Sequence, residues 1–168
     1  MVRGSLQKLI EDYVVKNKES HYRLAFSYVK NADDALDVVQ ESIYKALSNI
    51  DTIIKPDYIK TWYYRIIVNT SITLLRKRKK LVAVDDETLY GLNLGSVDNY
   101  EDIDLQQALE DLPVKYRSVV VLRFFEDFKI EEIAVILDEN VNTIKTRLYK
   151  ALKMLHVKMD VEVREENL

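Results

Sequence analysis

The 168-residue sequence contains no cysteine, which excludes disulfide bonds and thiolate metal sites. Only three glycines and two prolines are present, so the chain has few of the residues that end helices or form turns between strands. No stretch of about 18 apolar residues occurs, and the sequence reaches Glu11 and Asp12 too early for a secretory signal. These absences favour a helical, cytoplasmic protein.

Residues with catalytic potential are also scarce. The two histidines, His21 and His156, lie far apart and lack the spacing of metal ligands, and three glycines cannot supply a Gly-rich phosphate loop. Carboxylate pairs such as Glu131 and Glu132 are explained as solvated faces of helices. We therefore expect no enzyme activity, no catalytic residue, no metal, no cofactor and no small-molecule substrate.

The net charge of −3 hides a strong segregation of charge along the chain. Residues 1–80 carry 15 basic and 9 acidic side chains, whereas residues 81–110 carry 8 acidic and no basic ones. Residues 111–168 carry 10 basic and 11 acidic side chains and are nearly neutral. Such asymmetry indicates two modules joined by an acidic connector, and the basic module suits a nucleic acid better than the average charge suggests.

Apolar residues recur at helical spacing along most of the chain, and no alternating strand pattern competes with them. Asn31 is suited to cap the third helix, because its side chain can accept a hydrogen bond from the first turn. Pro56 is suited to the start of the fourth. Helices are predicted over residues 5–17, 20–30, 31–50, 56–80, 103–111, 114–126, 130–137 and 141–158.

Residues 81–104 interrupt this pattern with Gly91 and Gly95 among Asp, Asn and Ser. A structureless connection of this length is unusual inside one compact domain. The sequence therefore predicts an all-α fold of two small helical domains that are loosely tethered in the free chain. The predicted parts are an N-terminal helical bundle over 1–80, an acidic flexible linker over 81–104, a C-terminal helix-turn-helix domain over 105–160, and a frayed acidic tail over 161–168.

The segment from Lys129 to Leu155 has the pattern of a helix-turn-helix that reads DNA. Two apolar-faced helices are separated by Asp138, Glu139 and Asn140, a three-residue turn of the length this motif uses. Asp138 falls where positive φ is needed, which Asp tolerates better than most residues, and Asn140 can cap the second helix.

The second helix of this motif is basic from Val141 to Met159 and contains no acidic residue there. A helix of this kind can enter the major groove, while the acidic first helix braces it. The outward residues expected to reach bases or phosphates are Thr143, Lys145, Thr146, Tyr149 and Lys150. The alternative is a three-helix bundle with a solvated basic face.

A second informative segment combines aromatic and basic residues. Between Tyr58 and Lys80 there are seven basic residues and no acidic one. Cationic grooves with aromatic faces hold single-stranded DNA, and an extruded base also needs polar groups for its edge. Trp62, Tyr64, Arg65 and Asn69 could form such a pocket. The alternative is that Trp62 and Asn69 are simply core-facing positions at helical spacing.

Three segments together resemble a known family, the bacterial RNA polymerase sigma factors of the extracytoplasmic-function subfamily. Residues 37–41 (DVVQE) resemble their polymerase-binding helix. Residues 62–70 (WYYRIIVNT) with 74–78 (LLRKR) resemble their −10 element helix. Residues 112–155, beginning LPVKYR, resemble their −35 reading domain. The resemblance covers about residues 5–158.

The resemblance implies specific roles and partners. The chain would bind core RNA polymerase and promoter DNA, melted at the −10 element and duplex at the −35 element. An anti-sigma factor, in many relatives anchored in a membrane, would hold it inactive. Asp37, Gln40 and Glu41 would contact the polymerase. The −10 element would be contacted by Trp62, Tyr64, Arg65, Val68, Asn69, Arg76, Lys77 and Arg78. The −35 element would be contacted by Arg117, Thr143, Lys145, Thr146, Arg147, Tyr149 and Lys150.

The sequence departs from the family pattern at the turn. Asp138 stands where the family often has glycine, and the recognition face is partly lysine rather than arginine, so the promoter sequence is not predicted. The alternative function is a dimeric helix-turn-helix regulator that does not bind polymerase. The segments 37–41 and 62–70 argue against it, because such a regulator does not need them.

Overall fold

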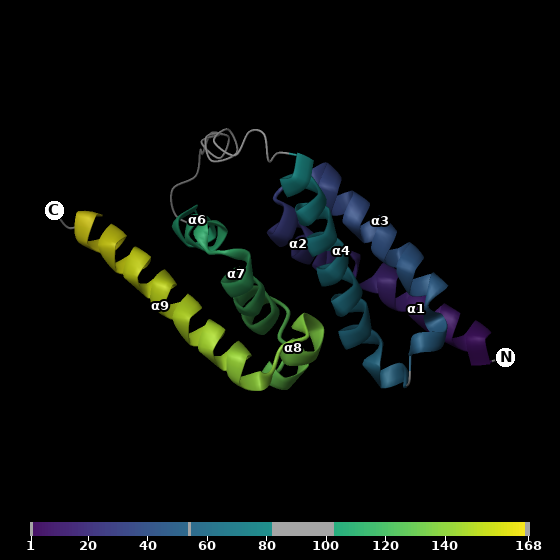
Figure 1. Ribbon diagram of the computed structural model, residues 1–168. Coiled ribbons are helices and arrows are strands. Elements are labelled where there is room, and N and C mark those ends of the chain that lie inside the picture. Colours follow the sequence, from purple (N-terminus) through teal and green to yellow (C-terminus); the bar gives the residue numbers. More distant parts are fainter. Residues whose placement is uncertain (1, 54, 82–102, 167–168) are drawn as a thin grey trace.

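The computed structural model describes residues 2–53, 55–81 and 103–166, and every regular element in these ranges is helical, which confirms the predicted all-α fold (Figure 1). Nearly all of the predicted linker, 81–104, lies outside the described residues. The helices are α1 (Val2–Lys16), α2 (Lys18–Val29), α3 (Ala32–Ser48), η1 (Ile50–Thr52), η2 (Pro56–Tyr58), α4 (Ile59–Leu81), α6 (Ile103–Asp111), α7 (Val114–Val120), η3 (Val121–Phe125), α8 (Ile130–Leu137) and α9 (Val141–Glu166).

The N-terminal helices form a bundle. Helices α2, α3 and α4 pack against one another, and α1 contacts α3 and η1 (Figure 1). The predicted apolar faces meet in its interior, where Leu24, Ala35, Val38, Tyr63 and Ile67 are at most 1% exposed. This packing presents one side of α3 and one side of α4 to the outside.

Polar side chains fix the ends of the predicted helices. Asn31 Oδ1 accepts a 3.0 Å hydrogen bond from the Asp34 backbone N–H, as predicted for the start of α3. Asp138 has φ 55° at the end of α8, and Asn140 Oδ1 accepts a 2.8 Å bond from the Thr143 N–H at the start of α9. The predicted turn of the helix-turn-helix is therefore confirmed.

Helix α9 spans the C-terminal domain. Helices α6, α7 and α8 all contact it, and Ala108, Leu112, Val120, Ala151 and Leu155 form a buried cluster between them. The predicted frayed tail is not observed up to Glu166, because α9 continues through it. No Gly or Pro follows Leu155 to end the helix, and helix-forming residues dominate there.

A π-helical turn follows α7. Residues Val121–Phe125 adopt it, and the Glu126 N–H donates to Val121 O at 3.0 Å, five residues back. The chain then turns at Asp127, with φ 58°, and the Phe128 N–H donates to Leu122 O at 3.0 Å. This turn directs the Glu126 and Phe128 side chains toward the N-terminal bundle.

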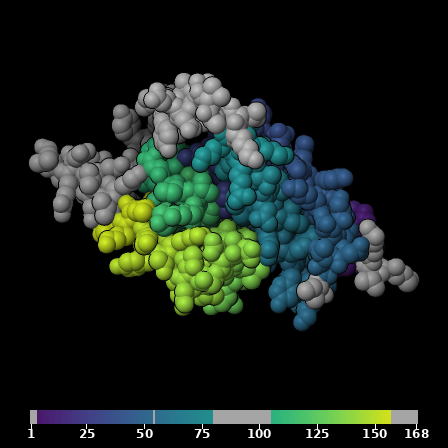
Figure 2. All heavy atoms as spheres, in the orientation of Figure 1, coloured from purple at the N-terminus to yellow at the C-terminus, as the bar shows by residue number. Residues whose placement is uncertain are grey.

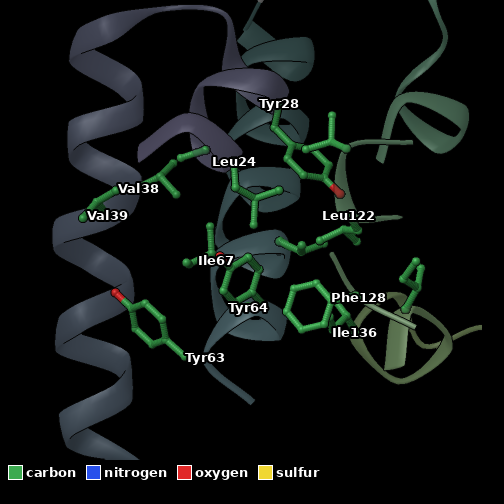
Figure 3. Packing of buried hydrophobic residues seen from close by; sticks show 14 of the residues in the cluster. Leu24, Tyr28, Val38, Val39, Tyr63, Tyr64, Ile67, Leu122, Phe128 and Ile136 are labelled. Carbon is green, nitrogen blue, oxygen red and sulfur yellow. The ribbon is translucent and has the colours of Figure 1, made fainter. Parts of the chain in front are cut away.

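The two groups of helices pack directly on each other. Helix α4 contacts α8, α2 contacts α7, and Figure 2 shows the atoms of α8 against those of α4. One buried cluster runs from Leu24 and Ile67 through Leu122, Phe128 and Ile136 (Figure 3). The expectation of loosely tethered domains is therefore wrong for this structure, because apolar side chains of the N-terminal and C-terminal helices pack in one common cluster.

Candidate nucleic-acid interface

An open pocket lies between the end of α3 and the outer side of α4. Its volume of about 370 Å³ is within the range of small-ligand sites. Trp62 forms part of its wall, and its indole Nε1 donates a 3.0 Å hydrogen bond to Thr52 Oγ1, which fixes the ring. The lining residues are Lys45, Asn49, Thr52, Trp62, Arg65, Ile66, Asn69 and Thr70. An aromatic wall, two cations and several amide or hydroxyl groups match what an extruded base requires.

Three of the four residues predicted to form this pocket do line it: Trp62, Arg65 and Asn69. Tyr64 does not line it, because it lies on another side of α4 and is only 2% exposed. Val68 is likewise 1% exposed. In this structure, neither of these two side chains can touch DNA.

The α3 side of the pocket was missed by sequence reasoning. Lys45 Nζ donates a 3.2 Å hydrogen bond to Thr70 Oγ1 and lies 3.6 Å from Glu41 Oε1. Asn49 and Thr52 complete this side. The polar residues at the end of the third predicted helix and in the break after it were the available signal, but nothing in the sequence placed them beside Trp62.

The basic end of α4 contains two kinds of residue. Arg76 and Lys77 are exposed and available to phosphates. Arg78 instead makes an ion pair with the buried carboxylate of Asp34, at the start of α3. Arg78 therefore ties α4 to α3 in this structure.

The exposed side of α9 presents the predicted −35 residues. Lys145, Thr146, Tyr149 and Lys150 are exposed, and Thr143 is half-buried. A shallow polar hollow beside them is lined by Lys115, Tyr116, Asn140, Asn142, Thr143, Thr146, Arg147 and Lys150. The contributions of Lys115 and Tyr116 from α7 were not predicted, since these residues lie outside the helix-turn-helix motif and precede Asn140 by about 25 residues.

Two arginines predicted for this surface are engaged within the protein. Arg147 makes a 3.0 Å ion pair with Glu139 in the turn, while remaining part of the hollow. Arg117 is 6% exposed, and its guanidinium donates to Glu110 O at 3.1 Å and Leu112 O at 3.0 Å. Burial lowers the pKa of Arg117 from its usual value. Its placement supports a structural role at the end of α6 and not a phosphate contact.

A third surface lies on the outer side of α3. Asp37, Gln40 and Glu41 are all exposed there and share one face, as their i, i+3, i+4 spacing predicts. Two large apolar side chains flank them, Leu36 at 48% exposure and Tyr44 at 73%. Exposed apolar residues among carboxylates are typical of a protein-binding surface. Sequence reasoning missed both apolar residues, although each lies four residues from Gln40.

Comparison with known families accounts for both halves of the chain. Residues 14–81 match the model of Sigma-70 region 2, and residues 102–155 match that of Sigma-70, region 4. The RNA polymerase sigma factor SigV of Bacillus subtilis is 53% identical over 160 residues, covering 95% of this chain and 96% of that protein. The ECF RNA polymerase sigma factor SigW of the same organism is 31% identical and covers 92% and 90%.

Two solved structures have a fold similar to that of this chain. The sigma factor RpoE of Bartonella quintana, in complex with the anti-sigma factor NepR, superposes with a TM-score of 0.75 at 25% identity and covers 90% of this chain and 96% of its own. CnrH, in complex with the cytosolic domain of CnrY, has a TM-score of 0.67 at 22% identity, covers 92% and 90%, and shows the same fold.

The fold and the two matched regions define a sigma factor. The chain belongs to the extracytoplasmic-function sigma factors, which bind core RNA polymerase and direct promoter-specific transcription initiation. Within the described residues, no helix is both long and apolar enough to cross a membrane.

Proposed function

We propose that this sigma factor uses its three exposed surfaces for three separate contacts. The outer side of α3 binds core polymerase, the pocket beside Trp62 holds a base of the melted −10 element, and the outer side of α9 reads the −35 element. The observation that carries this proposal is the pocket. An aromatic wall with flanking cations suits a base of melted DNA, and a protein that reads only duplex DNA does not need such a pocket. We place the functional boundaries at residues 1–80 and 105–160.

At the −10 element, the non-template base would enter the pocket against the Trp62 indole. Asn69 and Asn49 offer an amide oxygen and an amide N–H to its edge, while Lys45 and Arg65 supply positive charge for the backbone. Arg76 and Lys77 would contact phosphates further along the strand. Trapping one base in this way offsets part of the free energy of unpairing.

At the −35 element, α9 would enter the major groove at its N-terminal end. Thr143, Thr146 and Lys150 line the hollow and would face base edges or phosphates, with Lys145 and Tyr149 beside them. Lys115 on α7 would contact the adjacent backbone. Lysine contacts phosphate as a point charge, so much of the affinity here depends on salt concentration.

An anti-sigma factor is the proposed regulatory partner, and the cytoplasm the proposed location. The proposal rests on the structural relative from Bartonella quintana, which was solved with such a factor bound. The exposed Leu36 and Tyr44 make the α3 surface one that such a partner could cover. The chain itself would perform no catalysis.

Run-off transcription with purified core polymerase on genomic fragments tests the proposal. We expect the chain to direct initiation from specific promoters. Lys150→Ala should lower −35-dependent initiation roughly 5- to 10-fold without weakening the binding of core polymerase. Asp37→Lys should instead weaken core binding and lower initiation on every template. Lys16→Ala, at an exposed lysine on α1, is the matched control and should leave both unchanged.

Two results would contradict the proposal. If the chain alone bound a palindromic duplex tightly as a dimer and core polymerase added no promoter specificity, it would be a conventional helix-turn-helix regulator. If Lys150→Ala abolished core binding, the assignment of the α9 surface would be wrong.

A further inference from the structure

A further pocket lies on the side of α2 that faces α6 and α7 (Figure 1). Its lining residues come from α2, α6, α7 and the π-helical turn, and none of them lines the pocket beside Trp62 or the hollow on α9. Its volume is about 160 Å³, which is below the range of drug-sized ligand sites and suits a small molecule. We call it the α2–α6 pocket.

The wall of the α2–α6 pocket is mainly apolar. Phe26 and Leu109 are half-buried there, and Phe125 leaves 56% of its surface exposed. The Tyr22 ring centroid lies 6.1 Å from that of Phe26 and packs beside it. An apolar group that entered the pocket would displace water from Phe26, Leu109 and Phe125, which is favourable.

One buried carboxylate oxygen of the pocket lacks a donor. Glu126 is 7% exposed, and its Oε2 accepts a 2.7 Å hydrogen bond from Tyr64 Oη. Its Oε1 is buried and has no hydrogen-bond partner among the described residues, which is costly for a carboxylate. An ammonium group has three N–H donors and would satisfy it. Arg23 and Phe125 line the same pocket with exposed side chains, which can shift to admit such a donor.

Cations supply the opposite charge in the pocket. Lys30 Nζ donates a 2.6 Å hydrogen bond to Glu110 O, and Arg117 Nη1 donates to the same oxygen at 3.1 Å. Burial, and then the nearby charge of Arg117, lowers the pKa of Lys30. Arg23 is exposed and donates a 3.3 Å hydrogen bond to Ser20 Oγ. A carboxylate held by Lys30 and Arg23 would reduce the repulsion between Lys30 and Arg117.

The negative and positive groups lie close enough for one small molecule to meet both. Burial, and then the Glu126 carboxylate, raises the pKa of Tyr64, whereas the Arg23 guanidinium lowers it. Both charges therefore act on one hydroxyl. An α-amino acid carries its ammonium and its carboxylate on a single carbon and offers both partners at this short spacing. An alkylamine or a fatty acid offers one of them and leaves the other unpaired.

We infer that the α2–α6 pocket is a binding site for a free α-amino acid with an apolar side chain. The ammonium donates to Glu126 Oε1, and the carboxylate pairs with Arg23 and Lys30. The apolar side chain packs against Phe26 and Leu109. This site is separate from the surfaces proposed for polymerase and DNA, and its occupation requires neither of them.

Calorimetric titration of the full chain with L-leucine tests the inference. We expect a dissociation constant of about 0.5 mM, as suits a ligand of this size. Leucinamide lacks the carboxylate and 4-methylpentanoate lacks the ammonium, so each should bind at least roughly 10-fold more weakly. Glycine has both charges without the apolar side chain and should also bind more weakly.

Two variants assign the two charged groups of the ligand. Arg23→Ala should weaken leucine binding roughly 10-fold and abolish the preference for leucine over leucinamide. Glu126→Gln removes the negative charge at nearly constant shape, so leucine and 4-methylpentanoate should then bind about equally. Lys18→Ala and Glu19→Gln, at exposed positions of α2 outside the pocket, are the matched controls and should bind leucine as the wild type does.

Circular dichroism of each variant shows whether it still folds. Arg23→Ala keeps the test decisive if Glu126→Gln does not, because Arg23 is exposed and outside the core. The inference is overturned if leucine does not bind at up to roughly 10 mM, since water alone would then fill the pocket. It is also overturned if 4-methylpentanoate binds the wild type as tightly as leucine, or if Arg23→Ala leaves leucine binding unchanged.

Discussion

His21 lies where α1, α2 and α4 meet, and its ring is 1% exposed. Its Nε2 shares a 3.2 Å hydrogen bond with the Tyr13 hydroxyl, and the Tyr63 and Tyr64 rings lie 4.7 and 5.2 Å away. Burial lowers the pKa of His21 to about 4. The imidazole is therefore neutral at pH 7, and folding is linked to its deprotonation.

The stability of the chain should fall in mild acid because of His21. Between pH 6.5, the usual pKa of histidine, and about pH 4, the unfolded chain binds a proton that the folded chain does not. His21 therefore makes its full contribution to the free energy of unfolding above pH 6.5. This contribution should fall by about 2 kcal/mol between pH 7 and pH 5. Urea unfolding at these two pH values measures the loss.

His21→Gln provides the comparison, since glutamine can still hydrogen-bond to Tyr13 but does not titrate. We expect the variant to be less stable than the wild type at pH 7 and to lose about 2 kcal/mol less on acidification. An identical loss in both proteins would show that another group causes the acid sensitivity.

Single residues also show where sequence reasoning stops. Trp62 and Asn69 were placed in one pocket correctly, because they share a helix face. Tyr64 was assigned to DNA from its residue type and position, and Arg78 and Arg117 were assigned to DNA from the resemblance to the family. Two of the three have partners more than 40 residues away, Glu126 and Asp34, and no local pattern reveals such a pairing.

At the scale of elements, local chemistry was informative. The caps at Asn31 and Asn140 and the left-handed turn at Asp138 depend on a few neighbouring residues, and all three were predicted. The π-helical turn at Val121–Phe125 was not, since residues 114–126 have an ordinary helical pattern. Its geometry depends on the packing of Leu122 and Phe128 against the N-terminal bundle.

The cap of α9 should contribute measurably to the stability of the C-terminal domain. Asn140→Ala removes the acceptor of the Thr143 N–H and should lower the free energy of unfolding by about 1 kcal/mol. Urea unfolding of the full chain measures it. Asn142→Ala, at an exposed position just inside the same helix, is the control.

Alanine is a better helix former than asparagine, so Asn142→Ala should leave stability unchanged or slightly higher. An equal loss in both variants would mean that the side chains act through something other than the cap.

At the scale of the whole molecule, the main finding is that two DNA-binding domains share one core. Charge segregation and the acidic segment 81–104 predicted two domains, and the two matched regions agree with two functional units. Their packing was not predictable, because it depends on the complementary shapes of α4 and the α7–α8 segment. In the packed arrangement, Arg65 of the pocket beside Trp62 lies 4.0 Å from Asp138 in the turn of the helix-turn-helix.

The distance between the two domains tests this account most directly. Because the chain has no cysteine, Lys18→Cys on α2 and Gln107→Cys on α6 would give two unique sites for spin or fluorescent labels. Both positions are exposed and lie outside the three proposed surfaces. In the free chain, we predict a short, narrow distribution of label distances. On addition of core RNA polymerase, the distance should increase by roughly 30 Å or more, as the span between promoter elements requires. A distribution that polymerase leaves unchanged, or one already long and broad in the free chain, would contradict the account.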